Sequence, residues 1–379
     1  MKNKYLLLII LNLILILPSI RFFDKFLNLY FFGFYILFFN FIFIVSINKK
    51  EIVKKILSFP YWGFILIILS IANYFIYPLV DARKKIANSG STGDDAMILA
   101  ANTLKNTAKL YDVIINNHTP ISPGPGWIIL NSPFPLLNLF FLFSPIYLFF
   151  ILFLIKKYYK NIISNLFIII LFMSLITVEL FFNGHDILPF SLGFLICTLL
   201  IHENLKKDIN IKYVILISIF LGMVSTSRII FFFVPFLFYF LLNPYHKKNS
   251  IILLIISSII FWGFNTYFYF INKIYQPLHL IHKAKNLLGI PILIFGSCIF
   301  ITINYFIIKK IIKDNIENWL LIIMSVFSLI LIPVSLGDLI RQDFNFKTWE
   351  GANYFMPIIP FFVLYINLKN YTINENNCE

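Results

Sequence analysis

The chain has 379 residues, of which 60% are hydrophobic, 19% aromatic and 13% charged, and its mean hydropathy is +0.86. This composition excludes a soluble globular domain and predicts a protein that crosses a membrane several times. The formal net charge of +14 is expected to mark cytoplasmic loops and contacts with anionic lipid headgroups, and not nucleic acid. Cys197, Cys298 and Cys378 have no spacing typical of a disulfide or a zinc site.

Apolar segments long enough to cross a hydrocarbon core of about 30 Å recur along the whole chain. They predict an all-α polytopic membrane protein in which residues 1–379 form a single integral membrane domain. The first segment resembles a signal peptide but lacks a small-residue cleavage site, so we expect a retained signal anchor. About twelve transmembrane helices are predicted, at 5–20, 29–47, 60–80, 132–155, 162–180, 187–201, 211–226, 229–242, 250–270, 289–308, 318–335 and 353–368.

The distribution of basic residues predicts the orientation of these helices. If the N-terminus is cytoplasmic, more than half of the 31 Lys and Arg residues fall in short inner loops, as the positive-inside rule requires. The segment 81–131, the only long one polar enough to stand outside a membrane, then lies on the outer side. We expect it to be an outer catalytic loop within the membrane domain.

An acidic pair lies within this outer segment. Thr92-Gly93-Asp94-Asp95 begins a predicted amphipathic helix, since apolar residues follow at alternating spacings of four and three. Thr92 and Asp95 have the spacing of a capping box, and the helix dipole favours acids in a first turn by roughly 0.3–1 kcal/mol each. Asp94 and Asp95 are therefore either helix caps or catalytic carboxylates at the membrane boundary.

The two faces of this helix are predicted from the same spacing. Its apolar face comprises Met97, Ala101, Leu104, Ala108 and Tyr111, and its wet face Asn102, Thr103, Lys105, Asn106 and Lys109. His118 and the stiff turn Pro123-Gly124-Pro125-Gly126 follow the helix, as in an active-site loop. His118 is a candidate substrate-binding residue.

Four further polar groups are predicted at the outer boundary. His185 and Asp186, in a tight loop, suit a metal, a phosphate or a sugar hydroxyl, although such loops also carry polar residues only to stay wet. Arg228 lies between two apolar segments, where a guanidinium is costly unless it reaches the interface or binds an anion such as a lipid phosphate. Arg341 lies in the loop 336–352, whose charged and aromatic residues suit an anionic ligand or an ordinary interface belt.

Taken in order, these motifs resemble the GT-C class of membrane glycosyltransferases, whose mannosyltransferase-like members use polyprenyl-phosphate-linked sugars. The resemblance covers most of residues 60–368. It rests on Gly93-Asp94-Asp95-Ala96, Ala100, Leu104, Leu110-Tyr111, Ser122-Pro123-Gly124-Pro125-Gly126, Gly184-His185-Asp186, Gly222 to Arg228, and Tyr354-Phe355-Met356-Pro357-Ile358-Ile359-Pro360. Two features depart from the class: extra predicted spans precede the acidic loop, and Asn353 stands where a basic residue often precedes the Tyr.

The resemblance implies sugar transfer from a polyprenyl-phosphate donor to a hydroxyl of a lipid or glycan acceptor, with inversion at the anomeric carbon. Asp94 or Asp95 would take the acceptor proton, and we expect Asp94 to be the base. Arg228 and Arg341 would hold the donor phosphate, while His118, His185, Asp186 and Tyr354 would contact substrate. Some members of the class need a divalent metal such as Mg²⁺ or Mn²⁺, and Asp95 with Asp186 is the only acid combination suited to hold one.

Two other functions remain open from the sequence. An envelope polysaccharide polymerase or ligase is also polytopic, but usually carries a late outer loop that relies on Arg and His. A lipid or solute transporter should show charged or broken segments in two matching halves, and few are found here. The rich usage of Ile, Phe, Lys and Asn suggests an AT-rich bacterial genome, so the expected location is the bacterial inner membrane, with the endoplasmic reticulum as the alternative. The site would face the periplasm.

Overall fold

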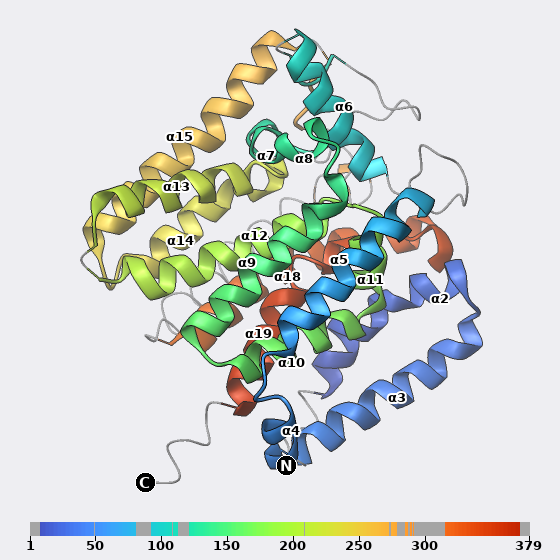
Figure 1. Cartoon of the computed structure of the whole chain (residues 1–379). Helices are drawn as coiled ribbons and strands as arrows, with labels where there is room; N and C mark the ends of the chain where they lie inside the picture. The colour runs from blue at the N-terminus through green and yellow to red at the C-terminus, as the bar shows by residue number, and fades with distance from the viewer. Residues whose placement is uncertain are drawn as a thin grey trace.

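The computed structural model describes residues 8–48, 50–80, 92–107, 109–112, 121–207, 209–272, 274–278, 285–286, 289, 291 and 315–371. Over these residues the chain is helical apart from short connections, and no strand occurs among them. The all-α prediction is therefore confirmed for the described part of the chain. Figure 1 shows these helices packed side by side around a common centre.

The first half of the described chain contains η1 (Asn12–Ile16, π-helical), η2 (Leu17–Ser19, 3-10), α2 (Ile20–Phe26), α3 (Leu29–Asn48), α4 (Lys50–Ile56), α5 (Tyr61–Val80), α6 (Thr92–Thr107), α7 (Pro125–Asn131), α8 (Pro133–Leu136), η4 (Phe140–Leu142, 3-10), α9 (Phe143–Tyr158), α10 (Asn161–Met173) and α11 (Leu175–Phe182). The second half contains α12 (Ile187–Leu200), η5 (Ile201–Leu205, π-helical), α13 (Ile211–Ser225), η6 (Ile229–Phe233, 3-10), α14 (Val234–Leu242), α15 (Lys247–Ile271), α18 (Ile316–Arg341), η7 (Phe346–Thr348, 3-10), η8 (Glu350–Phe355, 3-10) and α19 (Ile359–Tyr371).

Five helical segments are long and apolar enough to cross a membrane, and a sixth is added if a bent pair counts as one span. The five are α5, η4 with α9, α12 with η5, α15 and α18. The predicted count of about twelve is therefore not confirmed. Three apolar helices within predicted spans are shorter, at 29–45, 211–225 and 229–242, and most of the predicted span 289–308 lies outside the described residues.

The bent pair replaces the predicted continuous span 162–180. Helices α10 and α11 meet at 88°, because Ser174 between them has an extended backbone. The hydroxyl of Ser174 donates to the Leu15 carbonyl (3.0 Å), and the Leu175 N–H donates to the hydroxyl of Ser19 (3.0 Å). Polar groups at the break are thus bonded inside the protein, as a membrane interior requires.

The predicted span 132–155 also differs from the structure. Pro133 and Pro135 confine α8 to one turn, and Asn138 has a φ of 58°. Proline removes backbone donors, and a left-handed residue ends a helix. The membrane-length segment consequently begins only at Phe140 and runs to Tyr158.

The core of the molecule surrounds α12, which is buried along nearly its whole length and packs against α9, α13 and α19. Figure 1 shows α12 in the middle of the molecule, α15 along one edge and α3 along another. Peripheral helices instead expose large apolar side chains, including Phe64 and Ile67 of α5 and Ile255 and Ile259 of α15. This is the surface expected of helices that face lipid.

One end of the bundle gathers aromatic residues and lysines. Lys206 lies over the rings of Tyr245 (4.6 Å) and Trp319 (5.1 Å), and Lys156 lies over Trp62 (5.8 Å). Side-chain bonds tie 158–159, at the end of α9, to Glu203 and Asn204. We call this the basic end. Near the other ends of these helices, Tyr77 of α5 lies against Gly184, which follows α11, and Arg228, which follows α13, bonds Asp186.

Candidate active site

Within the segment 81–131, residues Thr92–Thr107 form the helix that the sequence predicted, α6, although it ends at Thr107 and not near Tyr111. Met97 and Ala101 are fully buried, whereas Asn102 and Lys105 are exposed, as predicted. The wet face is wrong at Thr103, which is buried and donates its hydroxyl to the Leu99 carbonyl (2.8 Å). An intrahelical bond of this kind allows a threonine to face the core.

Both carboxylates of the acidic pair are buried, Asp94 completely and Asp95 with 6% of its surface exposed. The hydroxyl of Tyr77, near the end of α5, donates to Oδ2 of Asp94 at 2.9 Å. A carboxylate that only caps a helix can stay exposed to solvent. Burying an ionised carboxylate is costly unless specific partners compensate it. The structure thus places the pair inside the protein at the junction of α5 and α6.

Tyr77 itself was not predicted as a site residue, because one tyrosine in an apolar span is indistinguishable from an interface aromatic. Its ring packs against Phe140, with the ring centroids 5.9 Å apart. The ring also lies against Gly184, where an added Cβ would come within 2.7 Å of it and where φ is +71°. Gly184 therefore permits both the left-handed turn and the close approach of Tyr77.

The two acidic loops that the sequence singled out are in contact. A Cβ on Gly93 would lie 3.1 Å from the imidazole ring of His185. Asp94 follows Gly93 directly, and Asp186 follows His185, so the close approach brings the two acids into one region. This juxtaposition joins segments about ninety positions apart in the chain.

Asp186 and Arg228 form a buried, bidentate ion pair. Nη1 of Arg228 donates to Oδ2 of Asp186 and Nη2 donates to Oδ1, both at 2.8 Å. Although burial alone raises the pKa of the Asp186 carboxyl, the Arg228 guanidinium holds it well below its usual range. Arg228 is thus buried and paired inside the protein.

The guanidinium of Arg228 retains unused donors. Besides Asp186, its Nη1 donates to the Ser227 carbonyl (2.6 Å), and its Cζ lies 5.3 Å from the ring centre of Phe190. A guanidinium has five N–H groups, and the bonds made with described residues use three of them. One N–H on Nη2 and the Nε–H are left, and together they form the edge that suits two oxygens of a phosphate.

Two tyrosines lie close enough to Arg228 to interact with it electrostatically, Tyr354 of η8 and Tyr111. The hydroxyl of Tyr111 donates to the Pro123 carbonyl (2.9 Å), and its ring stacks on Tyr275 at 4.0 Å between centroids. Burial, together with Tyr275, raises the pKa of Tyr111 well above its usual value, so this phenol stays neutral. The predicted site residue Tyr354 is thus placed beside Arg228.

The Pro/Gly turn, residues 123–126, is hydrogen-bonded to the backbone that leads to Arg228. The Gly124 N–H donates to the Ser227 carbonyl (3.3 Å), and the Trp127 N–H donates to the hydroxyl of Thr226 (2.7 Å). A Cβ on Gly124 would lie 1.8 Å from the carbonyl oxygen of Thr226. Only glycine fits there without moving one backbone away from the other.

Gly124→Ala is therefore expected to displace the loop of Arg228 and to destabilise the protein by about 1–3 kcal/mol. Thermal unfolding of the purified protein in detergent measures this effect. Gly63→Ala in α5 is the matched control, because nothing lies within 4 Å of a Cβ at Gly63. Equal stability of the two variants would contradict the packing described for the turn.

Other predicted residues are not brought to this site. Arg341 is the last residue of α18 and is exposed. At this position it complements the helix dipole, and its predicted contact with a donor phosphate has no support. His118 lies outside the described residues.

For the metal hypothesis, both oxygens of Asp186 are already bonded to Arg228. No cluster of three His, Cys, Asp or Glu suited to a metal occurs among the described residues, so Asp95 and Asp186 do not fit a metal site.

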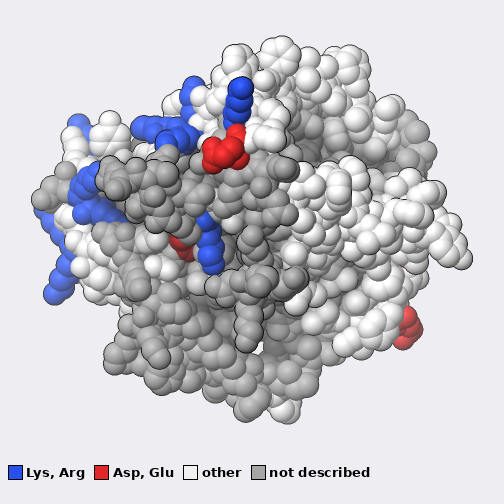
Figure 2. All heavy atoms as spheres, turned by 90° about the horizontal axis from the view of Figure 1, so that it is seen from below, with Lys and Arg blue, Asp and Glu red and all other residues white. Residues whose placement is uncertain are grey.

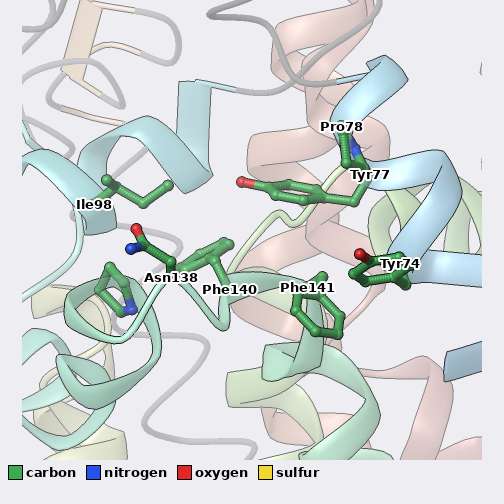
Figure 3. Close-up of a pocket in the computed structure, with 8 residues that line it drawn as sticks. Tyr74, Tyr77, Pro78, Ile98, Asn138, Phe140 and Phe141 are labelled. Atoms are coloured by element: carbon green, nitrogen blue, oxygen red, sulfur yellow. The ribbon is translucent and has the colours of Figure 1, made fainter. Parts of the chain in front are cut away.

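A pocket of about 270 Å³ opens beside the acidic pair. Figure 3 shows Tyr77 reaching across this pocket from α5 with its hydroxyl directed toward Ile98 of α6. Tyr77, whose hydroxyl bonds Asp94, is therefore part of the pocket wall. The lining is mostly aromatic and apolar, from Tyr74, Tyr77, Pro78, Ile98, Pro135, Asn138, Phe140 and Phe141.

Fold and site together define an all-helical protein with membrane-length helices and a buried acid–arginine site between their ends. No protein-family model, no curated protein and no solved structure matches the chain.

Proposed function

We propose that this protein is a membrane glycosyltransferase of the GT-C type. It transfers a sugar from a polyprenyl-phosphate-linked donor to a hydroxyl of a lipid or glycan acceptor, with inversion. The observation that carries the proposal is the meeting of two loops in one buried site, one bearing Asp94 and the other the Asp186–Arg228 pair. Sugar transfer from a lipid phosphate needs both a base and a cation within one site.

Asp94 acts as the general base. An acceptor hydroxyl becomes a nucleophile when a positioned carboxylate takes its proton as it attacks the anomeric carbon. The bond to Tyr77 at 2.9 Å holds the Asp94 carboxylate in one orientation, and Tyr77 is thereby a positioning residue. Asp95 is the neighbouring acid, whose part is to orient the acceptor or to complete the helix cap.

Arg228 receives the departing polyprenyl phosphate. As the bond between sugar and phosphate breaks, negative charge grows on the phosphate oxygens, and a fixed guanidinium stabilises that charge. Asp186 grips one edge of the guanidinium with two bonds at 2.8 Å and so fixes its plane. The edge formed by Nε and Nη2 then serves the phosphate, with Tyr354 beside it.

The pocket beside Tyr77 suits the acceptor. Its walls include the aromatic rings of Tyr74, Phe140 and Phe141 and the amide of Asn138, so they can contact the apolar face of a sugar or a lipid while the amide bonds a hydroxyl. Tyr77 connects this pocket to Asp94. An acceptor bound there would present its hydroxyl toward the base.

A direct test of the function uses membranes from cells that produce the protein. Radiolabelled polyprenyl-phosphate mannose and polyprenyl-phosphate glucose are supplied in separate reactions, and transfer of label to a new product is followed. A photoreactive polyprenyl phosphate tests the donor class without reference to the sugar. Photolabelling without transfer would favour a polymerase, and absence of both would favour a transporter.

The proposed topology has about twelve spans in a bacterial inner membrane, with the N-terminus in the cytoplasm and segment 81–131 in the periplasm. Cysteines introduced at Asn102 and Lys157, both exposed, should then differ in labelling by an impermeant thiol reagent on intact cells. We expect strong labelling at 102 and little at 157. Cys298 and Cys378 are replaced by Ser in this background, and Cys197 is buried. The reverse pattern would overturn the arrangement.

A further inference from the structure

The basic end carries a cluster of lysines that the proposed sugar transfer does not use. Lys207, Lys212, Lys247 and Lys248 are exposed, and Lys206 is half-buried beside them. The amide of Asn249, near the start of α15, connects this helix to the segment of Lys206 and Lys207, because it donates to the carbonyls of Leu205 (2.9 Å) and Lys207 (3.3 Å). We call Lys206, Lys207, Lys212, Lys247 and Lys248 the lysine patch. Figure 2 shows Lys and Arg gathered on one side of the face that it views, while much of the remaining described surface is white.

Three of these lysines occupy positions that helix stability disfavours. Lys212 is the second residue of α13, and Lys247 and Lys248 are the first two residues of α15. A helix N-terminus carries a partial positive charge, so cations there are repelled and acids are favoured. Neither helix has an acid in its first turn. The lysines and the two helix ends therefore add to one positive field that an external anion would relieve.

Few acids lie near the lysine patch among the described residues, and one of them, Glu203, interacts electrostatically with Lys206. Glu203 is bonded to its neighbour His202 (2.6 Å) and accepts from the Tyr159 hydroxyl (3.3 Å). Glu317 is a single further acid, in the first turn of α18, and Asp208 lies outside the described residues. Among the described residues, no acid forms an ion pair with Lys207, Lys212, Lys247 or Lys248.

The surface next to the lysine patch identifies the kind of anion. The same two helices, which pack against each other, also expose large apolar side chains, namely Ile211, Tyr213 and Leu216 of α13 and Ile251, Ile255 and Ile259 of α15. A nucleic acid or an acidic protein would match the lysines but not these exposed apolar side chains. A phospholipid matches both, because its phosphate and its acyl chains belong to one molecule.

We propose that the lysine patch is a binding site for an anionic phospholipid, whose phosphate lies on Lys207, Lys212, Lys247 and Lys248 and whose acyl chains lie along α13 and α15. This inference is independent of the proposed sugar transfer. It assigns the basic end to a membrane leaflet that contains anionic lipid. The lipid bridges the starts of α13 and α15, and α13 leads at its other end into the loop of Arg228.

Native mass spectrometry of the full chain, purified in an uncharged detergent, tests the proposal. Phosphatidylglycerol or phosphatidylcholine is added, and the number of retained lipids is counted. We expect the wild type to retain phosphatidylglycerol preferentially. The variant with Lys207, Lys212, Lys247 and Lys248 all changed to Gln should bind phosphatidylglycerol at least about tenfold more weakly.

The matched control changes Lys55, Lys156, Lys157 and Lys160 to Gln, which removes the same charge from other exposed lysines. Its affinity should stay within about twofold of the wild type. If the first variant does not fold, the doubles Lys207→Gln/Lys212→Gln and Lys247→Gln/Lys248→Gln replace it, each with an expected loss of about threefold. Equal losses in variant and control, equal retention of both lipids, or displacement of the lipid by a soluble oligonucleotide would overturn the proposal.

Discussion

Asp94→Asn is expected to lower the rate of sugar transfer by about 10²-fold or more, with little loss of folded protein. Asparagine keeps the shape of the side chain, and its Oδ1 can still accept the hydrogen bond of Tyr77. It cannot accept the proton of the substrate hydroxyl. Burial of Asp94 is complete, so replacing the carboxylate with a neutral amide removes a desolvation cost and should not unfold the helix. Initial rates with a polyprenyl-phosphate-linked donor measure the effect.

Asp95→Asn is the matched control, because it makes the same change one residue away in the first turn of α6. If the two acids only cap the helix, asparagine is itself a good cap and both variants should remain active. Full activity in both would remove the catalytic role from this loop. A smaller loss in Tyr77→Phe, with the KM of the acceptor raised, would support the positioning role of that tyrosine.

Arg228→Met is expected both to abolish activity and to destabilise the protein by about 3–5 kcal/mol, because it leaves the carboxylate of Asp186 buried without its partner. Judged only by its apolar sequence context, Arg228 could be replaced by an apolar side chain without loss of the fold, because the replacement removes a desolvation cost. The two bonds at 2.8 Å between Arg228 and Asp186 overturn that expectation. Unfolding in detergent by heat or denaturant measures the loss.

The double variant Asp186→Leu/Arg228→Met separates stability from function. Replacing both charges with apolar groups should recover most of the stability, while sugar transfer stays lost because no cation remains for the phosphate. Since the folded pKa of Asp186 is depressed, the contribution of the ion pair is complete above the unfolded pKa of about 3.9 and is lost as pH falls below it. The double variant should lack this acid-induced loss. Recovery of activity together with stability would contradict the role of Arg228.

Much of the candidate site could be located from the sequence. The helix of Asp94 and Asp95, the loop of His185 and Asp186, the Pro/Gly turn and Arg228 were all selected by local pattern and by their setting between apolar segments. Arg341 and the pairing of Asp95 with Asp186 as metal ligands were selected in the same way, and the structure supports neither. Local pattern ranks polar residues by context, but it does not show which of them face each other.

The sequence by itself determined that the protein is helical, that it belongs in a membrane and that an amphipathic helix begins at Thr92 to Asp95. Hydropathy and helical period are local properties, so they can be read without the fold. Only the tertiary structure decided that Tyr77 bonds Asp94, that Asp186 pairs with Arg228 across 42 positions, and that the chain bends by 88° at Ser174. Each of these depends on a partner distant in the chain, since a buried polar group is stable only where packing supplies its bond.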